Sequence, residues 1–501
     1  MTPVTLGQLQ GLPFVQAIAG AQGLPLLGVN SDSRAVQSGD LFAAVQGARS
    51  DGRKFVPQAL QQGAAAVLCD APLAQDVPHV RVDDVRARLG PIAHFVYGEP
   101  TKALKTVAVT GTNGKTTVGY LLETLLAEAG QRPALLGTVA ARGPAYAREA
   151  ELTTPEADAV ARFAADQLRA GATHLVMEAS SIAIDQRRTL GLSVEVGVFT
   201  NLTQDHLDYH GTMQAYGAAK ARLFEEYAPR HSVIMVDQPF GRLLGERAKG
   251  RVLRASMSPN AQAELRVLRY VSSRAGIEAS VETPWGLLSV QSPLFGAHNL
   301  ENLLVSIGSA LALGLERAQI ERALGVARGA PGRLERVATP LDLMVLVDYA
   351  HTPDAIERAL GALRPLTRGR LFVVCGCGGD RDPSKRAPMG EAAVRGADVS
   401  VLTSDNPRSE IPAQILAQMV VGAERAGQAR SLEQIKSHQN GYVVIEDRAE
   451  AIRCAIATAE PGDTLLIAGK GHETYQIVGR ERRSFDDRLE AAAALAAWGA
   501  G

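Results

Sequence analysis

The sequence contains few cysteines, and this scarcity excludes two ways of stabilising a fold. Four cysteines occur among 501 residues, at Cys69, Cys375, Cys377 and Cys454. A disulfide-stapled secreted domain needs a denser set, and a zinc site would need a second Cys or His pair to complement Cys375 and Cys377. We therefore expect a chain that relies on its own hydrophobic cores and works in a reducing cytoplasm.

An excess of either charge is also lacking. The formal net charge is −1, and the first 31 residues carry no charged side chain, so the basic region of a secretory signal is missing. Pro13, Pro25, Gln16 and Gln22 interrupt this apolar stretch and argue against a membrane span. We expect a cytoplasmic monomer that binds small molecules, with no nucleic-acid partner and no membrane insertion.

Lysine is scarce as well, with nine lysines against 43 arginines. Three of the nine, Lys115, Lys220 and Lys470, lie in motif-like segments. Arginine keeps its charge under ordinary conditions, whereas lysine can act as a neutral amine. Lysines at these places therefore indicate chemistry that arginine cannot supply.

The length favours about three domains, and the pattern predicts an α/β fold for each of them. Residues 1–105 form a mixed α/β stretch long enough to fold alone. Strands alternate with helical patterns over residues 106–336, which predicts a central parallel sheet with helices on both faces. A Gly- and Pro-containing break at residues 329–335 precedes a predicted doubly wound, Rossmann-like domain at residues 337–501. Its expected strands are 343–348, 371–376, 399–403 and 464–469.

The most informative segment is V-A-V-T-G-T-N-G-K-T-T, residues 107–117. It predicts a strand, a glycine-containing loop and a helix that begins at Thr116. This arrangement directs backbone N–H groups and a helix N-terminus at one phosphate. Lys115 would add a point charge, and the Thr116 hydroxyl could bind Mg²⁺. The candidate nucleotide contacts are Gly111, Thr112, Asn113, Gly114, Lys115, Thr116 and Thr117; the alternative is an ordinary strand-to-helix turn.

Two further polar residues follow predicted strands near this loop. Glu178 ends one strand, and His206 follows another, so a carboxylate and an imidazole could share a cation beside this phosphate-binding loop (the P-loop). Each could instead be an ordinary residue, Glu178 as a solvated strand end and His206 as a hydrogen-bonded loop histidine. Lys220 falls on an amphipathic helix, where spacing alone favours a lysine that faces solvent.

Motifs along nearly the whole chain resemble the Mur ligase family of bacterial cell-wall synthesis, and within it the ligases that add the third residue of the peptidoglycan stem peptide. The segments that carry the resemblance appear in family order. They are D-S-R-A-V-Q-S-G-D-L-F, V-T-G-T-N-G-K-T-T, T-N-L-T-Q-D-H-L-D-Y-H-G, P-G-R-L-E, D-Y-A-H-T-P-D-A, G-C-G-G-D-R-D, D-N-P-R and G-K-G-H-E.

The resemblance implies a fold and a reaction. The expected domains are an N-terminal UDP-binding α/β domain, a central P-loop ATPase and a C-terminal Rossmann-like domain that holds the amino acid. The expected reaction adds meso-diaminopimelate to UDP-N-acetylmuramoyl-L-alanyl-D-glutamate, with ATP as co-substrate. A substrate carboxylate attacks the γ-phosphorus to give an acyl phosphate, and an amine then displaces phosphate.

The resemblance also assigns the central residues. Lys220 matches the family's carbamylated lysine, formed from CO₂, which would help Glu178 and His206 to hold one Mg²⁺ while Thr116 holds another. Lys115 and the metals would offset the charge on the transferred group. Further ATP contacts fall on Asn299, Arg333 and Asp348. Asp348 would accept from the ribose hydroxyls; the alternative is a strand-end carboxylate that caps the next turn.

For the nucleotide-linked substrate, the resemblance points to small polar residues in two regions. In the N-terminal domain these are Ser31, Ser33, Ala48, Arg49 and Ser50. In the central domain they are Thr153, Thr154, Ser180, Gln186 and Arg188.

The third domain would hold the amino acid through Arg381, Asp405, Asn406, Pro407, Arg408, Gly469 and Glu473. Arg408 would read the second carboxylate of diaminopimelate, since a guanidinium pairs with a carboxylate bidentately, and Glu473 would take the distal ammonium. The alternative for Arg408 is a salt bridge to Glu410 or to a neighbouring residue.

Two departures from the family pattern affect the edge of the site. Ile182 replaces a histidine after the metal-binding glutamate, and Met235 replaces an asparagine near the adenine, which suggests a more apolar base pocket. Three alternatives remain: the same ligase with lysine or ornithine as its amino acid, a folylpolyglutamate-synthetase-like ligase, and an inactive nucleotide-binding scaffold. The intact Lys115, Glu178, His206 and Lys220 argue against the scaffold.

Overall fold

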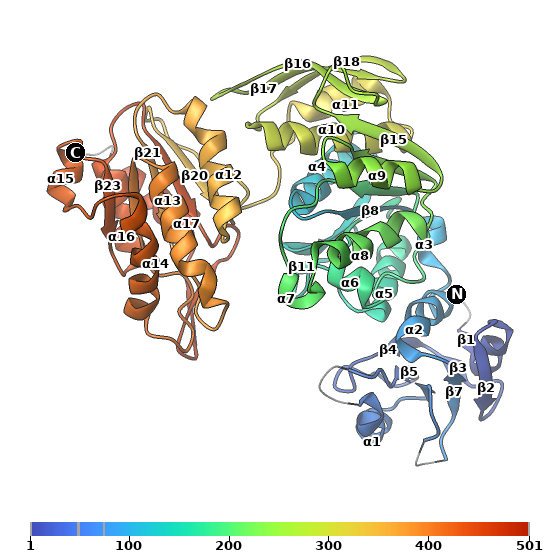
Figure 1. Cartoon of the computed structure of the whole chain (residues 1–501). Coiled ribbons are helices and arrows are strands. Elements are labelled where there is room, and N and C mark those ends of the chain that lie inside the picture. Colours follow the sequence, from blue (N-terminus) through green and yellow to red (C-terminus); the bar gives the residue numbers. More distant parts are fainter. Residues whose placement is uncertain (1–2, 48–50, 74–75, 499–501) are drawn as a thin grey trace. The chain divides into compact units, whose positions relative to one another are not determined.

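The computed structural model describes residues 3–47, 51–73 and 76–498. The chain divides into two compact units, which Figure 1 colours from blue to yellow and from yellow to red. The first comprises residues up to Val271, with 277–293 and 299–328; the second comprises 272–276, 294–298 and the chain from Gly329 onward. The α/β class is confirmed, whereas the three-domain boundaries stay a prediction.

A five-stranded sheet forms the N-terminal part of the first unit. Its order is β2 (Val15–Ala19), β7 (His79–Val82), β6 (Ala66–Cys69), β5 (Asp40–Ala43) and β4 (Gly28–Asn30). Only β2 pairs antiparallel to its neighbour, among the strands described for this sheet. Leu41 and Phe42 belong to separate cores because successive side chains of a strand point to opposite faces.

The larger sheet of the first unit has β8 (Lys105–Thr110) in its interior. It is eleven-stranded, in the order β11 (Ala147–Glu149), β10 (Ala140–Arg142), β9 (Pro133–Leu136), β12 (His174–Glu178), β8, β13 (Val196–Phe199), β14 (His231–Met235), β15 (Arg251–Ser256), β16 (Leu265–Ser273), β17 (Gly276–Thr283) and β18 (Gly286–Ser292). From β9 to β16 the pairing is parallel, as predicted. The hairpin of β17 and β18 is antiparallel and was not predicted.

The second unit contains a six-stranded sheet with helices on both faces. Its order is β19 (Glu335–Val337), β20 (Met344–Asp348), β24 (Thr464–Ala468), β21 (Leu371–Cys375), β22 (Val399–Leu402) and β23 (Gly441–Val444). All pairs are parallel except β19 with β20. The four predicted strands are therefore confirmed, and β19 and β23 are additions.

Alternation along β20 explains why this sheet is covered on both sides. Met344 and Leu346 pack in one core with α12 (Pro353–Leu363), α13 (Arg386–Gly396) and α14 (Pro412–Ala426). Val345 and Val347 pack in another with α16 (Arg448–Thr458) and α17 (Asp487–Trp498). A strand that is apolar on both faces needs such a cover, which confirms the doubly wound prediction.

Across the described ranges, no helix combines the length and the apolar character needed to cross a bilayer. The four cysteines are all free thiols.

Candidate functional site

The P-loop lies between β8 and α4 (Lys115–Glu128), so the helix begins one residue earlier than predicted. Gly111 and Gly114 have φ angles of 149° and 89°, which favour glycine. A Cβ atom on Gly111 would lie 1.9 Å from Thr200 Oγ1. Lys115 Nζ donates to the carbonyl oxygens of Gly111 at 3.0 Å and Thr112 at 2.8 Å, so the lysine lies over the loop.

The segment after β13 holds this loop from the side. Asn201 accepts from the backbone N–H of Asn113 through Oδ1 at 2.9 Å, and its carbonyl accepts from Thr112 N at 2.9 Å. Thr200 Oγ1 donates to Asn113 O at 2.6 Å. Thr200 and Asn201 were not assigned a role from the sequence; only their place in the T-N-L-T motif pointed to them.

Glu178, at the end of β12, is buried beside the loop. Its carboxylate accepts from Thr116 Oγ1 at 3.0 Å, Thr138 N at 2.7 Å and Thr138 Oγ1 at 3.0 Å. With 1 % of its surface exposed, Glu178 is not a solvated strand end, so that alternative is wrong. Thr138 was missed because it follows a strand with no motif around it.

Lys220 lies on α8 (Met213–Glu225) and is 1 % exposed, so the solvent-facing interpretation is wrong. Its Nζ donates to Gly111 O at 2.8 Å and lies 4.4 Å from the centre of the Tyr216 ring. Burial lowers the pKa of Lys220 well below its usual value, and the charge of Lys115 lowers it further. The fold therefore favours a neutral amine at the P-loop.

His206 lies at the end of a loop, directly before α7 (Leu207–His210), with a φ angle of 51°. Its Nε2 is 3.5 Å from Asp205 Oδ2, and its ring centre is 6.2 Å from that of Tyr216. Tyr216 thus contacts both His206 and Lys220, but His206 makes no hydrogen bond or ion pair with Glu178, a residue that is also described. Its predicted role as a metal ligand stays a prediction.

The donor set at the loop fits Mg²⁺ better than a transition metal. Thr116 and Glu178 bring a hydroxyl and a carboxylate together, and Mg²⁺ prefers oxygen ligands completed by substrate phosphates. In the described part of the chain, no group of three or more His, Cys, Asp or Glu side chains is arranged to hold a metal ion. The protein alone therefore offers a partial shell that a nucleotide could complete.

Two asparagines of α10 (Ala297–Ala312) lie near the loop. Asn302 Nδ2 donates to Asn299 Oδ1 at 3.3 Å, and both residues are buried. A Cβ atom on Gly114 would lie 2.3 Å from Asn302 Oδ1. Asn302 thus lies against the P-loop, and the contact of Asn299 with ATP stays a prediction.

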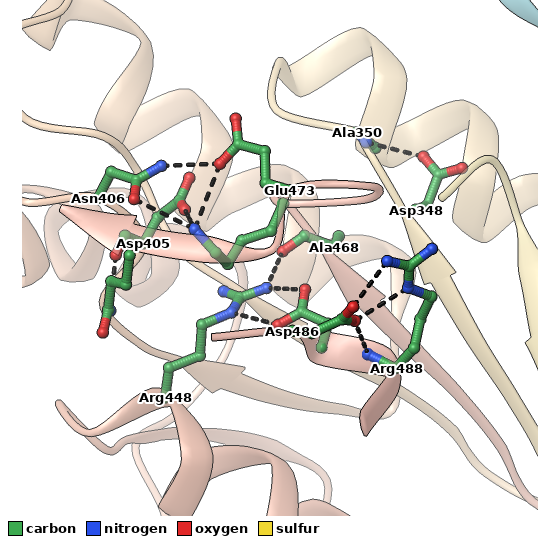
Figure 2. Close-up of polar contacts among 12 residues, drawn as sticks. Asp348, Ala350, Asp405, Asn406, Arg448, Ala468, Glu473, Asp486 and Arg488 are labelled. Atoms are coloured by element: carbon green, nitrogen blue, oxygen red, sulfur yellow. Dashed lines mark hydrogen bonds and ion pairs between the residues drawn. The ribbon is translucent and has the colours of Figure 1, made fainter. Parts of the chain in front are cut away.

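The remaining predicted ATP contacts belong to the second unit. Asp348 accepts from Leu334 N at 2.7 Å and from Ala350 N at 2.8 Å, the latter drawn in Figure 2. Desolvation raises the pKa of Asp348. The Arg333 guanidinium lies 4.5 Å from the centre of the Tyr349 ring. Asp348 thus caps the turn after β20, as the alternative held, and a role with ribose stays a prediction.

Residues predicted for the nucleotide-linked substrate line a cavity of the first unit. Ser31 and Ser33 border about 460 Å³ of space together with Arg86 and Glu156. The Ser31 hydroxyl donates to Asp158 at 3.0 Å, and the Ser33 hydroxyl donates to Gln58 Oε1 at 2.8 Å. Ala48, Arg49 and Ser50 lie outside the described residues.

The central group of predicted substrate residues is connected by hydrogen bonds beside Glu178. Thr154 Oγ1 donates to Glu178 O at 2.8 Å, and Arg188 donates to Thr154 O at 3.2 Å and to Gln186 Oε1 at 2.7 Å. Arg188 also pairs with Glu156 of the cavity at 3.1 Å. The remaining two join the same group: Thr153 contacts Thr138, and Ser180 contacts Thr154.

In the second unit, Arg408 has a φ angle of 52°, a conformation that costs energy in residues other than glycine. Hydrogen bonds to the β25 strand (Tyr475–Val478) and the turn after it hold this backbone, and Arg408 Nη1 donates to Gly379 O at 2.7 Å. Glu410 instead pairs with Arg386, at 2.8 and 2.9 Å. The alternative of an Arg408–Glu410 salt bridge is therefore wrong.

Loops after β22 and β24 meet around Lys470. Figure 2 shows Asn406 directed at Glu473, with Nδ2 donating to Oε2 at 2.9 Å. Lys470 Nζ lies 3.4 Å from Asp405 Oδ1, 3.2 Å from Asn406 Oδ1 and 3.3 Å from Glu473 Oε2. Two further predicted residues belong to these loops: Gly469 has a φ angle of 119°, and Pro407 is buried. Arg381 lies in the loop after β21 and is exposed.

Comparison with known proteins identifies the class. Family models match three successive segments: the Mur ligase family catalytic domain at residues 26–97, the Mur ligase middle domain at 109–310 and the Mur ligase glutamate ligase domain at 332–471. The chain belongs to the Mur ligase family.

Relatives of known name extend over nearly the whole chain. It is 45 % identical over 490 residues to the UDP-N-acetylmuramoyl-L-alanyl-D-glutamate--2,6-diaminopimelate ligase of Synechococcus elongatus, covering 95 % of each chain. It is 41 % identical over 488 residues to the ligase of the same name from Geobacter metallireducens, again covering 95 % of each chain. A solved structure of a ligase of that name aligns over 100 % of both chains, with a TM-score of 0.73 and 34 % identity.

A structure of Mycobacterium tuberculosis folylpolyglutamate synthase also aligns, with a TM-score of 0.59 and 19 % identity, over 80 % of this chain and 92 % of that one. At this identity the likeness concerns the fold alone.

Proposed function

We propose that this protein is a MurE-type ligase that couples ATP hydrolysis to the addition of meso-diaminopimelate to UDP-N-acetylmuramoyl-L-alanyl-D-glutamate in peptidoglycan precursor synthesis. The observation that carries the proposal is the convergence of Lys115, Glu178 and buried Lys220 on one P-loop. The near-full-length relatives with that name support the choice of substrates. We further propose that it acts as a cytoplasmic monomer.

The P-loop residues would position the triphosphate and offset its charge. The loop N–H groups and the N-terminus of α4 favour phosphate, and Lys115 adds a positive charge. Thr116 and Glu178 would hold Mg²⁺, which supplies further positive charge at the transferred phosphoryl group when bound. The substrate carboxylate then attacks the γ-phosphorus, and the amine attacks the resulting acyl phosphate.

Lys220 would act as a carbamate. A neutral Nζ can form a bond to the carbon of CO₂ and release one proton, which places a negatively charged oxygen group at the loop. The burial of Lys220 and its lowered pKa favour the neutral amine that this step requires. His206 would complete this side of the site.

The loops of the second unit would select the amino acid. Arg408 would pair with the distal carboxylate of diaminopimelate, and Glu473 would accept from its ammonium. Lysine and ornithine lack that carboxylate and would leave Arg408 without a partner.

An amino-acid panel tests the choice of substrate. Phosphate release is measured with ATP, the muramoyl dipeptide nucleotide and either diaminopimelate, lysine or ornithine. We expect activity with diaminopimelate, and Arg408→Ala should lower kcat/KM for it by about 100-fold, as expected for a lost charge-assisted interaction. The matched control is exposed Arg395→Ala.

The outcomes of this panel are distinct. A preference for lysine or ornithine would identify the ligase that uses that amino acid. Turnover with folate and glutamate would favour the folylpolyglutamate alternative, and no turnover with any acceptor would favour the scaffold.

A second experiment tests the carbamate. Lys220→Met should abolish ligation while keeping the fold, and exposed Lys249→Met should change neither. Labelled bicarbonate should give a carbamate carbon resonance in the protein without substitutions and in Lys249→Met, but not in Lys220→Met. Full activity of Lys220→Met would contradict the assignment.

A further inference from the structure

Lys470 belongs to the G-K-G-H-E motif and is buried at the centre of the loops that would receive the amino acid, yet the proposed reaction gives it no task. We propose that Lys470 is a positioning residue: its ammonium fixes the Asn406 amide and the Glu473 carboxylate in the orientation that receives the incoming diamino acid. This inference rests on the proposed function.

The hydrogen bonds around Asn406 allow one amide orientation. Asn406 Oδ1 accepts from Ile477 N at 2.9 Å and from Lys470 Nζ at 3.2 Å, while Nδ2 donates to Glu473 at 2.9 Å. An ammonium and a backbone N–H can only donate, so both must face the amide oxygen. The NH₂ group is thereby directed at Glu473.

The charges around Lys470 give it a second role. Its Nζ lies between the carboxylates of Asp405 and Glu473, at 3.4 and 3.3 Å, and its side chain is fully buried. Without the ammonium, two carboxylates would repel each other across a space of low polarity. With the Lys470 ammonium in place, Lys470, Asp405 and Glu473 together carry a net charge of −1, which favours binding of one ammonium group of the ligand.

The structure also anchors the backbone that carries Lys470. Arg448 donates to Ala468 O at 2.9 Å and forms a fully buried ion pair with Asp487 at 2.7 Å. Figure 2 shows Arg448 directed at Ala468, at the end of β24 and two residues before Lys470. The position of the ammonium is therefore set by the sheet and not by a free loop.

Steady-state kinetics of Lys470→Met test this role. We expect the KM for diaminopimelate to rise by about 10- to 100-fold, the cost of losing hydrogen bonds to charged groups. The KM values for ATP and for the nucleotide substrate should change by less than about twofold, because the hydrogen bonds and ion pairs of the Lys470 ammonium in the described part of the chain go to Asp405, Asn406 and Glu473. The exposed Lys436→Met of the same unit is the matched control.

A charge rescue distinguishes positioning from a general structural role. Adding Asp405→Asn to Lys470→Met removes one of the two like charges, so the KM for diaminopimelate should fall relative to Lys470→Met alone. A merely structural role predicts that the two losses add. Lys470→Gln, which keeps N–H donors, serves if Lys470→Met does not fold.

Two results would each overturn the inference. The first is an unchanged KM for diaminopimelate in Lys470→Met, or in Lys470→Gln if Lys470→Met does not fold. The second is a KM that Asp405→Asn does not lower; both KM values are compared with that of the unsubstituted protein, which must ligate diaminopimelate. Failure of that unsubstituted protein with every diamino acid would instead refute the proposed function.

Discussion

Replacing Gly114 by alanine measures how closely the P-loop is packed. Gly114 precedes α4 with a φ angle of 89°, and an added Cβ would lie 2.3 Å from Asn302 Oδ1. Alanine therefore meets two penalties here, backbone strain and a collision. Gly130, with a φ angle of 77° and no atom within 4 Å of an added Cβ, meets only the first.

The two penalties can be estimated separately. A left-handed conformation costs alanine roughly 1–2 kcal/mol. To avoid the new Cβ, Asn302 must move and lose its 3.3 Å hydrogen bond to Asn299, which is worth about 1 kcal/mol. We therefore expect Gly114→Ala to lower the free energy of unfolding by roughly 2–3 kcal/mol and Gly130→Ala by roughly 1–2 kcal/mol.

Urea unfolding and the KM for ATP provide the measurements. In an Asn302→Ala background the collision is absent, so Gly114→Ala should cost only its strain there. The KM for ATP should rise in Gly114→Ala and stay unchanged in Gly130→Ala. Equal costs of Gly114→Ala in both backgrounds would refute the packing argument.

Two further predictions concern stability. Arg448→Met leaves Asp487 buried without its partner and should cost about 3–5 kcal/mol of unfolding free energy. Arg34→Met breaks a solvent-exposed pair and should lower the free energy of unfolding far less, and similar costs for the two variants would contradict the burial argument. Burial lowers the pKa values of His94 and His174 to about 4. The unfolded chain then binds protons that the folded chain does not, so the free energy of unfolding should fall from pH 6.5 to 4, by about 3 kcal/mol for each histidine. Urea unfolding of His94→Gln should show a weaker pH dependence, and an unchanged one would refute this.

The main secondary structure could be predicted because its signals are local. β8 is apolar and is followed by glycines and a helical pattern, so the strand and the loop were found and the start of the helix was predicted to within one residue. The parallel strands of both units also follow from buried apolar runs. The β17–β18 hairpin was missed although its strands alternate between buried and exposed residues and Pro284 and Gly286 mark the turn, so a local signal for it was present.

Some site residues could be found only through motifs, and their partners could not be found at all. Glu178 was selected from the end of its strand, yet Thr138, which donates to it twice, lies 40 residues away. Glu410 seemed a natural partner for Arg408 two residues away, but the loop directs it to Arg386. Proximity in sequence does not set side-chain pairing where the backbone turns sharply.

The amino-acid sequence by itself determined the α/β class, the phosphate-binding loop and the order of the motifs, since each depends on neighbouring residues. The tertiary structure decided that Lys220 is buried and not solvated, because its environment comes from the P-loop more than 100 residues away. It likewise placed Lys470 between two carboxylates that separate strands of the sheet bring together. Burial and charge pairing depend on long-range contacts, and these determine which residues of a motif can act.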